Sequence, residues 1–325
     1  MLRFFQRKKS EELIPGAIWL DLPDAHRKIE QKHRAGTITA DEATHLRQFA
    51  DEGYFLFSTD LSADDAKAFQ NDVDRLWNER PANITVAYDT PPKRFRDADA
   101  ARDRKPKYRI HDIHSYSAVA RRLYLDRRIH RWMSLILGEE PVATQSLFFE
   151  YGSQQALHRD SIVVPTPLFG HLAAVWIALE DIDPRSGALL YVPGSHKMPF
   201  YEFAPGQFVF DYARMGADDV ARAMRFHDEE MARRGLQTKM FTPNRGEAFV
   251  WHSALMHGGG PVEDERLTRR SYVIHYSSRR THPHRQAAVL TPEGTTEVWT
   301  TDELLPADGA LGFANPLDGR LEYTR

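Results

Sequence analysis

A histidine and an aspartate, His158 and Asp160, stand two positions apart in the polar stretch QQALHRD. In an extended chain, alternate side chains point to the same side, so these two can reach one point while Arg159 points away. Imidazole and carboxylate groups both bind metal ions, and this spacing suits two ligands of one ion. A solvated surface turn would carry the same pattern, so the pair alone does not define a site.

A third candidate ligand, His257, lies in GEAFVWHSALMHGGGP, after an apolar strand and directly before three glycines at 258–260. At these glycines the backbone can pass close to a bound group, because no Cβ stands in the way. Two imidazoles and one carboxylate on one face of a metal ion leave three positions open, as in non-haem Fe(II) oxygenases. His158, Asp160 and His257 are therefore the predicted metal ligands and the predicted catalytic centre.

The composition limits the classes of protein to which this chain could belong. The chain has 325 residues, of which 42% are hydrophobic and 27% charged, as expected of a folded globular protein. A formal net charge of -3 gives no general basic field for binding nucleic acid. The absence of cysteine excludes disulfides, thiolate metal sites and cysteine nucleophiles. The basic N-terminus MLRFFQRKKS lacks an apolar segment, and no apolar run reaches the roughly 18 residues of a membrane span, so we expect a cytoplasmic protein.

The first part of the chain, residues 1–140, is expected to be mostly helical. Capping-box patterns at 39–42 and 62–65 predict the starts of two helices on either side of a short buried strand at 54–57. A third helix is predicted over 118–137, with Gly138 past its end. Residues 91–109, with eight Lys or Arg against three Asp and little periodicity, are expected to form a loop.

Residues 141–280 change to short apolar or alternating strands separated by glycine and proline, which favours a β-sandwich or barrel. The expected strands are TQSLFFEY, LAAVWIALEDI, ALLYV, GEAFVW and RSYVIHY. The highly charged stretch 217–234, between two glycines, is predicted to be a helix inserted among these strands. Residues 281–325 form a C-terminal extension, and we expect one domain over 1–325.

Three segments of the chain together resemble one enzyme family. HRD, VWIALEDIDPRSGALLYVPGSHK and GEAFVWHSALMHGGGP followed by RRSYVIHY look like the phytanoyl-CoA dioxygenase family of Fe(II)- and 2-oxoglutarate-dependent oxygenases, and DEATHLRQFADEGYFLF is similar to its N-terminal portion. The resemblance covers residues 38–276. It implies a double-stranded β-helix, which is a cupin-like jelly roll, with flanking helices. Many members carry an asparagine soon after the distal histidine, where this chain has Val262-Glu263-Asp264.

The resemblance also implies an activity. His158, Asp160 and His257 would bind Fe(II), and Arg269 with Ser271 would bind the distal carboxylate of the co-substrate 2-oxoglutarate. The chain would then hydroxylate a C–H bond of a small molecule with O2, releasing succinate and CO2. Related halogenases replace the carboxylate ligand by a small residue, so the presence of Asp160 favours hydroxylation or another oxidation.

Two adjacent arginines compete for the co-substrate. If RRSYVIHY is a strand, Arg269, Ser271 and His275 share one face, whereas Arg270 lies on the other. Only the first face pairs an arginine with a hydroxyl group, so Arg269 is the predicted anchor.

Other readings remain open at this stage. The chain could be a catalytically silent jelly-roll sensor of metal or 2-oxoglutarate, or a zinc hydrolase with the same three ligands. His111, His114 and His252 are expected to make polar contacts instead of binding metal. Trp176 and Trp251 are expected to be core residues. The basic segment 93–109, with arginines at 279, 280 and 285, would suit an anionic substrate if it lined the pocket, or would be a solvated connection.

Overall fold

The computed structural model describes most of the chain between residue 18 and residue 278, together with four short C-terminal strands. The described ranges are 18–81, 84–88, 94–97, 104, 108–164, 166, 168–211, 214–278, 286–290, 296–300, 312–314 and 321–323. None of the helices in these ranges combines the length and the apolar character needed to cross a bilayer.

The N-terminal helices begin where the sequence predicts them. Thr39 caps α2 by accepting a hydrogen bond from the Glu42 N–H, and Ser62 caps α3 in the same way from Asp65, with both capping boxes complete. Gly53 ends α2 in the left-handed conformation at φ 81°, and a short strand follows directly. The elements are η1 (Trp19–Asp21), α1 (Ala25–Arg34), α2 (Ala40–Glu52), β1 (Tyr54–Ser58) and α3 (Ala63–Glu79).

The single helix predicted over 118–137 is wrong. Two helices, α4 (Ala118–Tyr124) and α5 (Arg127–Leu137), occupy this stretch after the short turn η2 (Ile113–Ser115). The helix is interrupted at Asp126. Its carboxylate accepts hydrogen bonds from the backbone N–H groups of Arg128 and Ile129 and so caps a new helix. Gly138 ends α5 as predicted.

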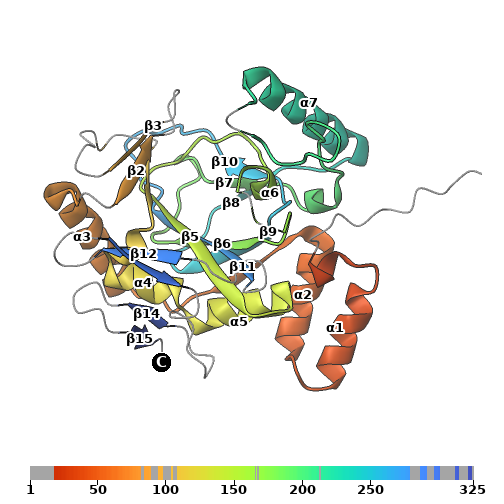
Figure 1. Ribbon diagram of the computed structural model, residues 1–325, viewed down its shortest axis with the longest axis horizontal. Helices are drawn as coiled ribbons and strands as arrows, with labels where there is room; N and C mark the ends of the chain where they lie inside the picture. Colours follow the sequence, from red (N-terminus) through yellow and green to blue (C-terminus); the bar gives the residue numbers. More distant parts are fainter. Residues whose placement is uncertain are drawn as a thin grey trace, which may run out of the picture.

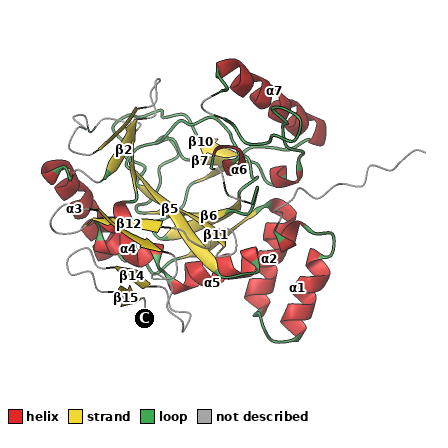
Figure 2. Cartoon of the chain, in the orientation of Figure 1, coloured by secondary structure: helices red, strands yellow, loops and turns green. Residues whose placement is uncertain are grey.

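Eight strands form the main sheet, in the order β1-β9-β6-β11-β5-β4-β2-β3, with antiparallel pairing throughout (Figures 1 and 2). The loop predicted over 91–109 is wrong near both ends, where basic residues lie in β3 at the edge of this sheet and in β4 between β5 and β2. The bounds after β1 are β2 (Thr85–Tyr88), β3 (Arg94–Asp97), β4 (Tyr108–His111), β5 (Pro141–Phe149), β6 (Ala173–Ala178), β9 (Glu247–His252) and β11 (Ser271–Ser278).

The two faces of the main sheet bury different sets of residues. On β11, Tyr272, Ile274 and Tyr276 belong to the large apolar cluster that the helices α2 to α5 complete, and we call this side the outer face. Val273 points the other way, into a second cluster shared with Trp176 of β6, and we call this side the inner face. Because strand residues alternate, each face can be assigned along every strand.

A second, smaller sheet packs over the inner face. Leu189 and Tyr191 of β7 and Phe241 of β8 join the apolar cluster of the inner face. The two sheets thus enclose a common core, and flanking helices cover the outside of the larger one, as in a double-stranded β-helix or jelly roll. The order is β10-β7-β8, with β7 (Leu189–Tyr191), β8 (Lys239–Phe241) and β10 (His257–Gly259).

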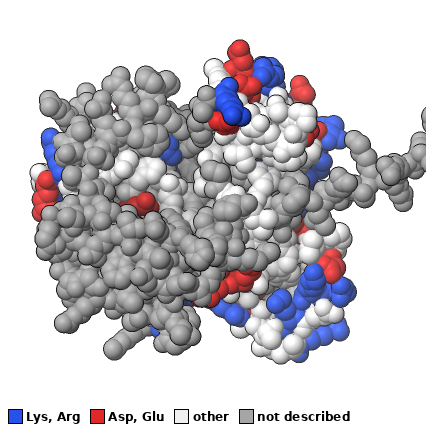
Figure 3. All heavy atoms as spheres, in the orientation of Figure 1, with Lys and Arg blue, Asp and Glu red and all other residues white. Residues whose placement is uncertain are grey.

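The inserted helix α7 (Ala217–Arg234) covers the residues predicted for it. It lies at the edge of the molecule, away from the helices of the outer face (Figure 1). Charged side chains of both signs are visible over it in Figure 3. The remaining short helices are α6 (Asp160–Val163) and η3 (Ser195–Lys197).

The C-terminal extension contains two antiparallel hairpins, β12 (Gln286–Leu290) with β13 (Thr296–Thr300) and β14 (Gly312–Ala314) with β15 (Leu321–Tyr323). The arginines at 279, 280 and 285 lie outside the described residues.

Candidate metal centre

Two of the predicted ligands, His158 and His257, come from chain segments that are hydrogen-bonded to each other. The two residues form an antiparallel bridge, with N–H to O distances of 2.9 and 3.0 Å between their backbones. Gly258 permits this approach, since a Cβ there would lie 2.6 Å from the carbonyl oxygen of Gln155. Gly258 therefore accommodates the segment that carries His158, and the close approach of these glycines to a bound group stays a prediction.

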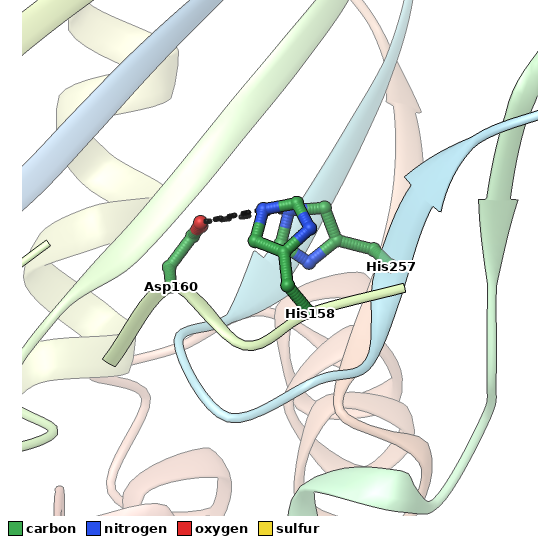
Figure 4. A group of neighbouring side chains, drawn as sticks. All are labelled: His158, Asp160 and His257. Atoms are coloured by element: carbon green, nitrogen blue, oxygen red, sulfur yellow. Dashed lines mark ion pairs between the residues drawn. The ribbon is translucent and has the colours of Figure 1, made fainter. Parts of the chain in front are cut away.

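Asp160 completes the group from the start of α6. Its Oδ1 lies 3.6 Å from Nε2 of His158 and 3.6 Å from Nε2 of His257, and the three side chains point toward one another (Figure 4). One ligand atom from each residue lies within 4.8 Å of the other two. Arg159 turns away, is fully buried, and donates to the carbonyl oxygen of Ser195 at 2.8 Å.

Backbone carbonyls orient both imidazoles for metal binding. Nδ1 of His158 lies 2.9 Å from the oxygen of Ala156, and Nδ1 of His257 lies 3.0 Å from the oxygen of Leu255. A carbonyl oxygen only accepts, so each Nδ1 carries the hydrogen and each Nε2 presents its lone pair. The lone pairs face the carboxylate of Asp160, which is the arrangement that a divalent ion requires.

The electrostatics favour the same protonation state. Burial lowers the pKa of His257 to about 4, so this imidazole is neutral at neutral pH. Burial would raise the pKa of Asp160, but its contacts with His257, His158 and His275 outweigh burial and hold the pKa well below its ordinary value. The carboxylate of Asp160 and the neutral imidazole of His257 are thus in the forms that bind a metal ion without first losing protons.

Two further residues hold the carboxylate of Asp160, a role that we predicted for neither of them. The indole Nε1–H of Trp251 donates to Oδ2 of Asp160 at 2.8 Å, and Nε2 of His275 lies 3.4 Å from the same oxygen. Both contacts engage Oδ2, which leaves Oδ1 for a metal ion. Trp251 therefore has a role beyond the core packing that we predicted for it.

Arg269 and Ser271 lie on the inner face, on the side of the metal ligands. The guanidinium of Arg269 is buried against the rings of Phe149 and Trp176, at 5.5 and 5.7 Å from their centroids, and Nη1 donates to Ser271 Oγ at 3.3 Å. Among the described residues no carboxylate forms an ion pair with it, and Nε has no hydrogen-bond partner. Burial lowers the pKa of Arg269 to about 10, so it stays charged at neutral pH.

The other candidate histidines make polar contacts away from the three ligands. Nδ1 of His114 lies 2.8 Å from Ser146 Oγ, and Nε2 of His252 lies 3.2 Å from an Asp21 oxygen. In the described part of the basic segment, Arg104 forms ion pairs with Asp74 of α3 and with Glu150 after β5, at 2.6 Å each. These ion pairs connect the segment to the fold. Gln155 was not predicted, yet its Nε2 lies 3.3 Å from Nε2 of His158.

Comparisons with known proteins agree with this geometry. The model of the family "Phytanoyl-CoA dioxygenase (PhyH)" matches residues 49–271. Peroxisomal phytanoyl-CoA dioxygenase of Bos taurus is 22% identical over 263 residues, covering 77% of this chain and 71% of the relative. Phytanoyl-CoA dioxygenase domain-containing protein 1 of Danio rerio is 28% identical over 214 residues, covering 62% of each.

Solved structures share the fold. EctD from S. alaskensis, crystallised with 2-oxoglutarate and 5-hydroxyectoine, superimposes with a TM-score of 0.54 at 20% identity, covering 85% of this chain and 86% of that one. SnoN, a non-haem alpha-ketoglutarate-dependent epimerase from nogalamycin biosynthesis, gives a TM-score of 0.52 at 17% identity over 74% of this chain and 83% of its own.

Proposed function

The chain belongs to the phytanoyl-CoA dioxygenase family, and from this premise we propose that it hydroxylates a C–H bond of a small-molecule substrate. It is a 2-oxoglutarate-dependent dioxygenase that uses Fe(II) and 2-oxoglutarate. The proposal includes a cytoplasmic location. We assign the activity to one domain, since β1 of the N-terminal portion pairs with β9 of the jelly-roll core.

The donor set fits Fe(II). We propose that Nε2 of His158, Nε2 of His257 and Oδ1 of Asp160 hold the ion on one face, so that three positions stay open for co-substrate and O2. Bound iron would supply the oxidising chemistry, in which 2-oxoglutarate and O2 yield succinate, CO2 and a hydroxylated substrate.

The remaining residues would bind and orient. Arg269 and Ser271 would receive the distal carboxylate of 2-oxoglutarate, because a buried guanidinium with an adjacent hydroxyl suits a bidentate carboxylate. Val273 and Trp176, in the apolar cluster between the sheets, would exclude water from this carboxylate and strengthen the contact. Asp160 keeps its carboxylate, so we propose hydroxylation over halogenation.

The observation that carries the proposal is the pairing of two features. Three side chains that can bind a metal ion converge, and a buried arginine without a carboxylate partner among the described residues lies on the same face of the sheet. A zinc hydrolase would need the first feature only. A silent sensor would bind both ligands but would not turn over.

Succinate formation from 2-oxoglutarate tests the proposal directly. We expect turnover with Fe(II), none with Zn(II), and none in His257→Ala. Turnover with Zn(II) would favour other chemistry at the centre. Tight binding of Fe(II) and 2-oxoglutarate without succinate, across a broad metabolite screen, would favour the sensor.

A further inference from the structure

A polar strip runs along β4 and β5 on the inner face of the main sheet. Arg109 is paired with Phe149, which is paired in turn with Ser271, and His111 is paired with Leu147. Residues directly opposite each other in a sheet point to the same side. Leu147 and Phe149 belong to the apolar cluster of the inner face, so Arg109 and His111 also face the space between the two sheets.

Burial of the alternate residues supports this assignment. Tyr108 and Ile110, which flank Arg109, belong to the cluster of the outer face, whereas Arg109 itself is half-buried. Gln145 of β5 is paired with His275, the residue that contacts Asp160, and its Nε2 lies 3.4 Å from Nδ1 of His111. The strip thus extends from Arg109 to Gln145, which lies opposite the histidine that contacts Asp160.

Two guanidinium groups share one aromatic ring at this strip. Arg109 lies 5.9 Å from the centroid of Phe149, and Arg269 lies 5.5 Å from the same centroid. Arg269 is assigned to the co-substrate, which is a single dicarboxylate whose other end binds the metal. A second cation on the same face, beside an amide and an imidazole, is suited to an oxyanion of a different molecule.

We propose that Arg109 binds a carboxylate of the substrate, with His111 and Gln145 lining the same subsite. This inference rests on the proposed function and names the substrate class. β4 lies two strands, about 10 Å, from β11, whose His275 contacts Asp160, so we expect the carboxylate to bind away from the metal ligands. Of these three side chains only Arg109 carries a fixed positive charge, which matches a singly charged carboxylate better than a phosphate dianion, so we commit to a carboxylate.

Matched pairs of probes test the subsite in the anaerobic protein loaded with Fe(II) and 2-oxoglutarate. Phenylacetate, 3-phenylpropionate, 4-phenylbutyrate and cyclohexanecarboxylate are each compared with the primary amide of the same acid, and phenyl phosphate is included. Binding is followed by the change in the visible absorption band of the metal–2-oxoglutarate complex. We expect at least one acid to bind at least tenfold more tightly than its amide.

The variants assign that preference to one residue. Arg109→Met should weaken binding of the acid at least tenfold and leave the amide within threefold, and Arg109→Lys should retain part of the preference. Arg128→Met removes the same charge from α5, on the outer face, and should change nothing. The proposal is overturned if no acid is preferred to its amide, if the preference survives in Arg109→Met, or if phenyl phosphate binds more tightly than every acid.

One further measurement separates this inference from the proposed function. The Kd of 2-oxoglutarate should change less than twofold in Arg109→Met. A large rise in that Kd, with unchanged binding of acids, would assign Arg109 to the co-substrate and refute the inference while the dioxygenase activity stands. Absence of succinate formation by the wild-type protein would instead refute the proposed function.

Discussion

Arg269 and Arg270 are neighbours in the chain with opposite surroundings. Arg270 donates from its backbone and from its side chain to the carboxylate of Glu180, at 2.7 and 3.1 Å. Arg269 is buried between aromatic rings and has no such carboxylate among the described residues. A buried cation without a counter-charge is costly, which indicates that Arg269 is kept for an anionic ligand.

Arg269→Ala should therefore raise the apparent KM for 2-oxoglutarate at least thirty-fold. Loss of a charge-assisted contact in a desolvated site leaves the ligand carboxylate unpaired, and thirty-fold corresponds to about 2 kcal/mol. Steady-state succinate formation at varied 2-oxoglutarate measures this, with Arg270→Ala as the adjacent control, for which we expect little change. The opposite ranking would show that the anchor assignment is off by one residue.

Trp251→Phe should weaken Fe(II) binding about tenfold. The substitution keeps most of the packing but removes the N–H that holds Oδ2 of Asp160, and loss of such a contact to a ligand typically costs 10- to 100-fold in metal affinity. Trp176→Phe is a matched control, since the Trp176 Nε1 is buried on the same face with no partner among the described residues. Titration of each variant with Co(II) in place of Fe(II), followed by absorption, gives its metal affinity. Equal effects of the two substitutions on this affinity would contradict the role assigned to Trp251.

The three metal ligands could be predicted from the sequence, but the role of Trp251 could not. His158 and Asp160 are two apart, so backbone geometry alone places them together, and His257 was found by its residue type and the glycines after it. Trp251 carries no comparable signal, because an indole that packs in a core and one that donates to a carboxylate look alike in a strand. Its contact with Asp160 depends on the place of β9 between β1 and β6 in the main sheet, which no local pattern reveals.

At the scale of elements, strand β10 determines the spacing of the two histidine ligands. Gly258→Ala should weaken metal binding and lower the free energy of unfolding by about 1 to 3 kcal/mol, because the new Cβ would lie 2.6 Å from a backbone oxygen. Gly216→Ala, before α7, has open space around the added Cβ and should change neither quantity appreciably. Thermal unfolding with and without Co(II) compares the two, and wild-type metal stabilisation in Gly258→Ala would refute this role of the strand.

Helix α7 is a candidate lid over the substrate. It is inserted between strands, and Val220 and Met224 on it are 41% and 40% exposed, which is unusual for apolar side chains one helical turn apart. Replacing residues 217–234 by a short glycine-serine linker should raise 2-oxoglutarate turnover relative to hydroxylated product, since lids exclude water from reactive intermediates. Parallel assays of succinate and product measure this coupling; a ratio equal to that of the wild type would refute the lid.

Elements with strong local signals were predicted, and those defined by pairing were not. The capping boxes at Thr39 and Ser62 fix helix starts through contacts within four residues, so sequence suffices. The break at Asp126 was missed because the apolar spacing continues across it. β10 and β3 were missed because a glycine-rich and a basic segment become strands only when a neighbouring strand supplies their hydrogen bonds.

At the scale of the whole molecule, burial keeps two histidines outside the metal centre, His196 and His227, neutral in the folded protein. Burial lowers the pKa of His196 to about 3, with a further contribution from the charge of His252. Burial also lowers the pKa of His227 on α7 to about 4, aided by the charge of Arg159. The ordinary value is 6.5, so the unfolded chain takes up protons that the folded protein excludes.

Stability should consequently be full above pH 6.5 and fall as the pH decreases toward 4. Between neutral pH and pH 5, each of the two histidines should lower the free energy of unfolding by about 2 kcal/mol. His227→Leu removes one titrating group, so it should reduce the loss by about 2 kcal/mol relative to the wild type. Urea unfolding at pH 7.5 and pH 5, followed by tryptophan fluorescence, gives these differences. An identical loss in the variant would mean that His227 is protonated in the folded protein at pH 5, and that α7 does not shield it.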